Sequence, residues 1–184
     1  MKRGIVCLLL LLLCGCAPNA GEPDEFTPVR VLGVDGGTPT ELTAVWNGAE
    51  GQPPRKGSCS GENFCEARER VPWVGEKELL LAGMGWLIVG RDVDLEGLLF
   101  GVLEDRELSP ASSLWLADEG AKALLEGCED PVAALELLEL QGVETPTAAR
   151  ALGSLLTDGK VRLPVLSAAE GALKWMGEEW WYGQ

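Results

Sequence analysis

Short apolar runs, separated by turn residues, divide the chain into strand and helix candidates. The β-branched and apolar run 28–34 and the alternating run 40–46 flank Asp35-Gly36-Gly37, and this arrangement predicts a β-hairpin. The apolar runs 84–89 and 113–117 are typical of strands that are buried on both faces of a sheet. Strand candidates of both kinds indicate a mixed sheet.

The clearest helix lies between the two buried strand candidates. It opens after Asp94, a residue type that caps helix N-termini. The apolar residues that follow recur at the spacing of one helical face, and they are Leu95, Leu98, Leu99, Val102 and Leu103. A strand, a helix and a strand in this order predict a right-handed crossover between two parallel strands.

Helical patterns cover much of the remaining chain. The other predicted helices are 62–71, 119–126, 131–141 and 145–156. Asp130-Pro131 and Thr145-Pro146 each place an N-cap residue before a proline, which is tolerated at the first position of a helix. The stretch 47–61 is rich in Gly, Pro and Ser, so we expect a loop there.

The last part of the chain predicts further strands. In the strand candidate 161–166, Pro164 favours an edge position, because proline cannot donate a hydrogen bond to a neighbouring strand. The Trp-rich segment 172–182 is expected to supply a last strand or two, with Trp175 in the core. The sequence therefore predicts an α/β (α+β) fold, in which a mixed β-sheet with a βαβ unit and several flanking helices forms a single domain.

The N-terminus has the layout of a secretory signal peptide. Two basic residues precede the apolar run 5–13, which is shorter than the roughly 20 residues that a spanning helix needs. The run ends in Leu13-Cys14-Gly15-Cys16, which resembles the lipobox of bacterial lipoproteins. Cys14 stands where that motif more often has Ala, Ser or Thr. The resemblance implies that Cys16 receives a diacylglyceryl group and becomes the new N-terminus.

These features divide the chain into three parts. Residues 1–15 are a lipoprotein signal peptide, residues 16–25 are a flexible polar tether, and residues 26–184 form the folded domain. Two or more acyl chains anchor a protein stably where a single chain does not. We therefore expect the domain at the extracytoplasmic face of the cell membrane. The alternative is a freely secreted protein, whose signal would more often end in Ala-x-Ala.

The composition excludes several classes of function. A formal net charge of −14 repels nucleic-acid phosphates and anionic lipid headgroups, so the expected membrane contact is the lipid anchor and nucleic-acid binding is not expected. The chain has no histidine, which excludes Ser-His-Asp and Cys-His catalysis and histidine-based zinc sites. We expect no catalytic residue, no metal and no cofactor.

The cysteines leave two alternatives open. Cys59 and Cys65 lie in or beside the Gly- and Ser-rich stretch, and they could form a local disulfide in an oxidising compartment. The other interpretation is two free thiols. The state of Cys128 is not determined by the sequence.

Four short segments, in order over about residues 29–177, carry a resemblance to a known family. They are Val31-Leu32-Gly33-Val34-Asp35, the stretch from Glu78 to Gly90, the helix and charged run from Asp94 to Leu108, and Leu163-Pro164-Val165-Leu166. In this order and spacing, the chain resembles the N-terminal domain of the Ger(x)C spore germination lipoproteins, the C subunits of germinant receptors. It lacks the Trp-Asp dipeptide that the family commonly has after the lipidated cysteine, and full-length members continue for two further domains.

The resemblance implies a non-enzymatic domain that acts through protein–protein contacts in spore germination. Its partners would be the membrane subunits of a germinant receptor, and its location would be the spore inner membrane. Trp180, Trp181 and Tyr182 form either a docking surface, since Trp and Tyr are favoured at interface hot spots, or a final strand packed on the core. The alternative function is a solute- or ligand-binding surface lipoprotein, which would need a concave pocket with converging polar side chains.

Replacing Cys16 by serine is expected to abolish lipid attachment, because serine has no thiol to carry the diacylglyceryl group. In cells fed a fatty-acid analogue, the wild-type chain should be labelled and Cys16→Ser should not. Equal labelling of the two chains would contradict the predicted anchor.

Overall fold

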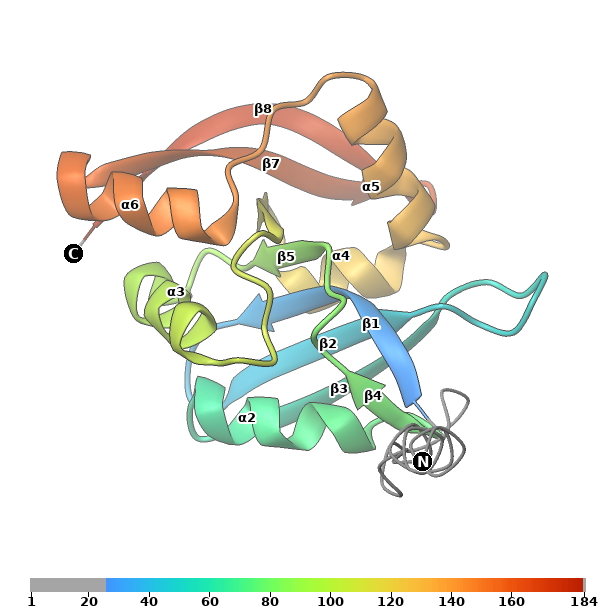
Figure 1. The fold of residues 1–184 in the computed structure, drawn as a ribbon. Helices are drawn as coiled ribbons and strands as arrows, with labels where there is room; N and C mark the ends of the chain where they lie inside the picture. The colour runs from blue at the N-terminus through green and yellow to red at the C-terminus, as the bar shows by residue number, and fades with distance from the viewer. Residues whose placement is uncertain (1–25, 184) are drawn as a thin grey trace, which may run out of the picture.

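Helices cover both faces of one mixed β-sheet in the computed structural model, which describes residues 26–183 (Figure 1). The strands lie in the order β3-β2-β1-β5-β6-β7-β8, and β4 pairs with the start of β1. The strands are β1 (Phe26–Asp35), β2 (Thr40–Trp46), β3 (Arg55–Gly61), β4 (Glu78–Leu80), β5 (Trp86–Val89), β6 (Ser113–Ala117), β7 (Lys160–Ala169) and β8 (Ala172–Tyr182). The helices are α2 (Phe64–Arg70), the 3-10 helix η2 (Val71–Trp73), α3 (Leu95–Glu104), α4 (Ala121–Gly127), α5 (Pro131–Leu140) and α6 (Ala148–Asp158). This arrangement confirms the predicted α/β fold class.

The predicted hairpin and crossover are both present. β1 and β2 are antiparallel, with Val34 opposite Leu42. β5, α3 and β6 form the crossover, and β5 pairs in parallel with both β1 and β6. Asp94 caps α3 as predicted, because its carboxylate accepts a hydrogen bond of 3.1 Å from the Gly97 N–H.

The core consists of two layers of apolar side chains, one on each face of the sheet. Side chains of α2, α3 and α6 pack in one layer, and side chains of α4 and α5 pack in the other. Successive residues of β5 alternate between the two layers, with Leu87 in the first and Ile88 in the second. The central strands are therefore buried on both faces, as their continuous apolar runs predict.

The expectation of a loop over 47–61 is wrong in its second half, where β3 pairs with β2. The small residues of this strand reflect close packing rather than a turn. A Cβ at Gly61 would lie 2.4 Å from the Ala67 N atom, and one at Gly57 would lie 3.1 Å from the Trp46 ring. Glycine in a strand marks such a close approach.

The last helix begins later than predicted. Its N-cap is Thr147, whose hydroxyl accepts a hydrogen bond of 3.3 Å from the Arg150 N–H, and Thr145-Pro146 lies outside the helix. Pro146 instead uses its carbonyl oxygen to accept a hydrogen bond of 2.9 Å from the Leu114 N–H. The segment before α6 therefore pairs with the first half of β6.

The predicted edge position of Pro164 is also wrong, because β7 lies between β6 and β8. β6 pairs with β7 only at Val165 and Leu166, so the ladder ends before it reaches Pro164. The missing N–H of Pro164 therefore leaves no gap in a ladder. The strand at this edge of the sheet is β8.

The chain enters the described fold at Phe26, on the side of the molecule opposite the β7–β8 hairpin (Figure 1). The predicted signal peptide, Cys16 and the tether lie outside the described residues. None of the helices within residues 26–183 is long and apolar enough to cross a membrane.

Truncating Leu99 in α3 is expected to destabilise the fold by about 2–5 kcal/mol, because its side chain is fully buried and its loss leaves a cavity. Its neighbour Phe100 is 42% exposed, and Phe100→Ala should change the free energy of unfolding by less than about 1 kcal/mol. Urea unfolding of both variants measures the difference. Similar values for the two would contradict the assigned packing of α3.

Candidate functional site

The β7–β8 hairpin presents one of its faces to solvent beyond the helices. Trp180 lies opposite Arg162 in the antiparallel register, and Tyr182 lies opposite Lys160. Residues directly opposite one another share a face of the sheet. Trp180 is 52% exposed and Tyr182 is 65% exposed, so this face carries large aromatic side chains that the core does not cover.

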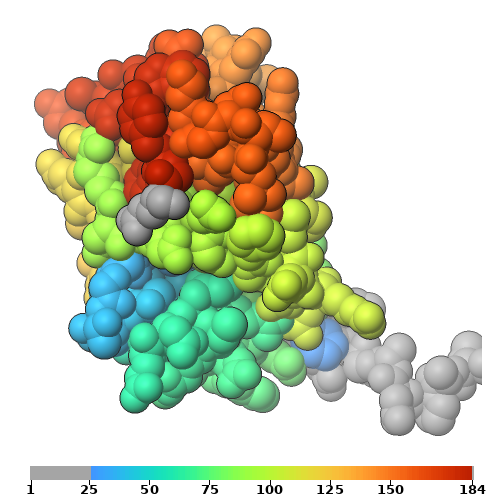
Figure 2. All heavy atoms as spheres, turned by 90° about the vertical axis from the view of Figure 1, so that its left-hand side faces the viewer, coloured from blue at the N-terminus to red at the C-terminus, as the bar shows by residue number. Residues whose placement is uncertain are grey.

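A groove of about 570 Å³ runs along this face. One wall is the segment 144–146 together with Arg150, Ser154 and Asp158 of α6, and the other is the hairpin. We call this feature the hairpin groove, and its hairpin wall consists of Lys160, Val161, Arg162, Glu178 and Trp180. Figure 2 shows α6 in orange beside the dark red end of β8, above α3.

The charges in the hairpin groove are unevenly matched. The Arg162 guanidinium lies 2.5 Å from the Glu178 carboxylate, and the Lys160 ammonium lies 4.7 Å from the centre of the Trp180 ring. Within residues 26–183, neither Lys160 nor Arg150 has a carboxylate within ion-pair distance. The groove therefore combines an aromatic face with two cations that lack a carboxylate partner.

The three candidate docking residues do not share one environment. Trp180 and Tyr182 point to the groove face, whereas Trp181 lies opposite Val161 and packs partly buried against the core. The alternative of a strand packed on the core therefore describes Trp181, and the docking surface stays a prediction for Trp180 and Tyr182.

The expected core position of Trp175 is wrong, since its side chain is 47% exposed. A register shift in the hairpin between Val165 and Leu166 changes the alternation of β8 at this point. Leu173, closer to the turn, is the β8 residue that reaches the core layer of α4 and α5.

A second group of charged side chains lies where the parallel strands end. Arg91, just after β5, forms ion pairs with Asp118 at 2.9 Å and with Glu179 of β8 at 2.8 Å. The hydrogen bonds from Arg91 lower the pKa of Glu179, and the same bonds raise the pKa of Arg91. This cluster ties the outer hairpin to the central strands.

The carboxylate of Asp35 is used within the fold at this end of the sheet. It accepts hydrogen bonds of 2.6 Å and 2.8 Å from the N–H groups of Ala121 and Lys122 at the start of α4. Gly120 precedes the helix with a φ of 94°, a conformation that favours glycine. The Lys122 ammonium pairs with Glu41 at 2.5 Å. These groups therefore have structural roles.

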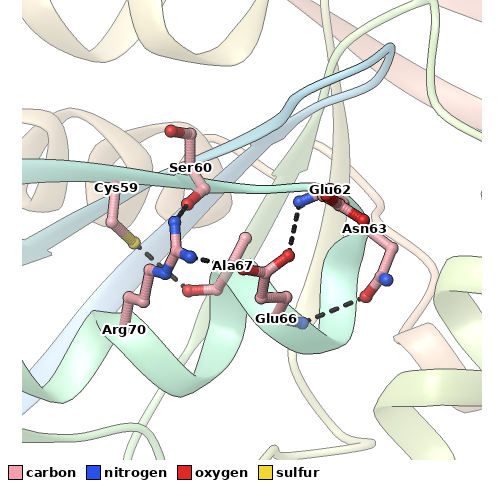
Figure 3. A network of polar contacts seen from close by, with 7 residues as sticks. All are labelled: Cys59, Ser60, Glu62, Asn63, Glu66, Ala67 and Arg70. Atoms are coloured by element: carbon pink, nitrogen blue, oxygen red, sulfur yellow. Dashed lines mark hydrogen bonds and ion pairs between the residues drawn. The ribbon is translucent and has the colours of Figure 1, made fainter.

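Cys59, Cys65 and Cys128 are free thiols in the structure, and the disulfide between Cys59 and Cys65 stays a prediction. The Cys59 thiol donates a hydrogen bond of 3.3 Å to the Ala67 carbonyl (Figure 3). Cys65 is exposed. Burial raises the pKa of the Cys59 and Cys128 thiols, which disfavours the reactive thiolate.

Polar contacts around Cys59 fasten α2 to β3 (Figure 3). The Asn63 side chain accepts a hydrogen bond of 3.0 Å from the Glu66 N–H and caps the helix. Arg70 donates to the Ser60 carbonyl and pairs with Glu66. These contacts therefore have structural roles: they cap α2 and hold it against β3.

In the part of the chain that the structure describes, no group of three or more Cys, Asp or Glu side chains is placed to hold a metal ion. No family model matches this chain, and neither a curated protein nor a solved structure matches it. The resemblance to the Ger(x)C lipoproteins therefore stays a prediction from the sequence segments that carry it.

Arg91→Gln is expected to raise the pKa of Glu179, because it removes the hydrogen bonds that stabilise the carboxylate. Carboxyl NMR titration of the wild type and the variant measures the change. An unchanged Glu179 midpoint would contradict the pairing.

The ion pair between Arg91 and Glu179 also makes the stability of the fold depend on pH. Because the pKa of Glu179 is lowered in the folded chain, the unfolded chain binds more protons as the pH falls from about 5 to 3, and stability is lost over that range. The half-exposed pair is screened by solvent, so Glu179→Gln should reduce this loss by less than about 1 kcal/mol.

Proposed function

We propose that this chain is a lipid-anchored, extracytoplasmic domain that acts by binding a protein partner through the hairpin groove. The observation that carries the proposal is the exposure of Trp180 and Tyr182 on one face of an outer strand. Large aromatic side chains that gather on an exposed face are typical of interaction sites, because Trp and Tyr dominate interface hot spots.

The position at which the chain enters the fold supports the combination of a lipid anchor with a partner site in the hairpin groove. The start of β1 lies on the side of the molecule opposite the β7–β8 hairpin (Figure 1). A lipid on Cys16 would therefore attach at the end of the domain away from the hairpin and leave the hairpin groove accessible. Confinement to a membrane raises the effective concentration of the domain near a membrane-protein partner, so a weak interface is sufficient.

The partners follow from the family resemblance. We propose that they are the membrane subunits of a germinant receptor and that the process is spore germination. The support is the order of the four sequence segments that resemble the Ger(x)C N-terminal domain, three of which lie in β1, around β4 and β5, and in β7.

We propose a binding role rather than catalysis because the groove offers no activated nucleophile. Ser154 is its serine, and no described side chain lies within hydrogen-bond distance of that hydroxyl to act as a base. The chain also lacks histidine, the commonest general base. The Arg162 and Glu178 side chains on the hairpin wall neutralise each other.

The dimensions of the groove favour one second candidate, a ligand-binding lipoprotein. Its volume of about 570 Å³ falls in the range of small-molecule pockets, and polar side chains converge on it. Most pockets of that kind are lined chiefly by apolar groups, whereas this lining is largely charged. Protein binding is therefore the function that the surface supports best.

Trp180→Ala is expected to weaken contact with the membrane partner by at least about tenfold, the cost of a central aromatic hot spot. A photo-crosslinking amino acid at position 182 of the full-length chain, expressed in its own cells, should give an adduct with a germinant receptor membrane subunit. Trp180→Ala should reduce the yield of that adduct.

The matched control is Trp73→Ala, because Trp73 is 73% exposed on η2, outside the hairpin groove. This variant should leave the adduct yield unchanged. Equal yields from the wild type and Trp180→Ala would contradict binding through the groove. An adduct with an unrelated membrane protein would contradict the germination assignment and keep the binding role.

A further inference from the structure

The two edges of the sheet differ in length and in the side chains that they carry. β3 forms one edge over 7 residues, and Arg70 of the adjoining α2 donates a hydrogen bond to the Ser60 carbonyl there. The charged residues Arg55 and Lys56 also lie in that strand. Short length, charge and cover by a helix are the usual means of preventing an edge from pairing with another chain.

β8 forms the other edge over 11 residues, which include the charged residues Lys174, Glu178 and Glu179 and a register shift. No helix residue donates a hydrogen bond to its described outer half, where Trp180 and Tyr182 are exposed. The Gly183 N–H donates a hydrogen bond of 2.9 Å to the Gly159 carbonyl, which marks this pair as hydrogen-bonded. Hydrogen-bonded and non-hydrogen-bonded pairs alternate along an antiparallel ladder. Trp181 and Glu179 therefore bond to β7, and Glu178, Trp180 and Tyr182 direct their N–H and C=O groups to the free edge.

These outward backbone groups belong to the residues that form the aromatic face. An extended segment paired along Glu178–Tyr182 would place alternate side chains beside Trp180 and Tyr182, on the groove side. Strand addition of this kind takes affinity from main-chain hydrogen bonds and specificity from pockets for alternate side chains. The register of the hairpin thus places free main-chain hydrogen-bonding groups and exposed aromatic side chains at the same edge.

The charges of the groove define the chemistry of the incoming strand. Most described cations of this acidic chain have a carboxylate partner, but Lys160 and Arg150 of the groove have none, and the Lys160 ammonium lies over the Trp180 ring next to the free edge. Glu144 and Asp158 on the wall repel further acidic groups. The matching segment has one acidic residue among apolar ones.

A second copy of this chain is a poorer match for the same edge. Each copy carries a formal net charge of −14, so two copies repel one another as they approach.

We infer that the free edge of β8 receives an extended segment of the partner as an added β-strand, with one carboxylate of that segment beside Lys160. This inference rests on the proposed function, since it specifies how the partner is held in the hairpin groove.

Three capped peptides test the inference on the full-length chain in detergent micelles. The first alternates valine and threonine around one central glutamate. The second has the same side chains with alternate backbone nitrogens methylated, and the third has lysine in place of glutamate. Fluorescence anisotropy of a labelled peptide measures affinity, and amide hydrogen exchange measures protection of Glu178, Trp180 and Tyr182.

The first peptide should bind and protect those three amides. N-methylation should weaken binding by at least about tenfold, because it removes the strand hydrogen bonds. The lysine peptide should bind more weakly than the glutamate peptide, and Lys160→Met should remove that preference without disturbing the hairpin. Arg106→Ala is the matched control, since Arg106 also lacks a described carboxylate partner but lies outside the groove.

Equal binding of the parent and N-methylated peptides, unprotected amides, or no binding of the first peptide below about 1 mM would each overturn strand addition. A glutamate preference that survives Lys160→Met would overturn the placement of the carboxylate. These outcomes leave binding through the groove intact, because that function fails only if the cellular adduct does not depend on Trp180.

Discussion

The pairing of β6 with β7 extends over only two residue pairs, and the shape of the hairpin groove depends on this limit. The first half of β6 pairs instead with the segment before α6, through the Leu114 N–H and the Pro146 carbonyl. α6 follows that segment and lies beside the hairpin. The outer half of β7 is therefore not paired with β6, and Lys160, Val161 and Arg162 of this half line the groove.

Side-chain packing, rather than ion pairing, holds this outer hairpin in place. Val161 and Leu163 are buried in the main core layer, and each such side chain contributes about 1.5–3 kcal/mol. The pair between Arg91 and Glu179 is half-exposed and contributes about 0–1 kcal/mol. The packing therefore supplies the stability, and the ion pair orients the end of β8 against the central strands.

The sequence predicts the elements whose signals are local. The turn at Asp35-Gly36-Gly37 and the cap at Asp94 are confirmed because each depends on neighbouring residues. β3 is not predicted because its glycines are explained by close packing against Trp46 and α2, and no local sequence pattern shows these contacts. The exposure of Trp180 and Tyr182 follows from strand alternation, but that of Trp175 depends on a register shift that no local pattern shows. Arg150 and Lys160 line one groove because of the path of α6, which no local pattern shows.

An open aromatic edge is a hazard for any protein domain, because exposed strands template aggregation. In this chain the net charge of −14 and the adjacent acidic pair Glu178-Glu179 oppose contact between copies, yet each glutamate is individually paired with an arginine. Two copies of the chain therefore repel one another at long range, while the charges of Glu178 and Glu179 at the edge are balanced by their arginine partners. A segment that brings one carboxylate to Lys160 meets a cation that no described carboxylate pairs with. The same arrangement of charge thus disfavours self-association and leaves the edge open to a different partner.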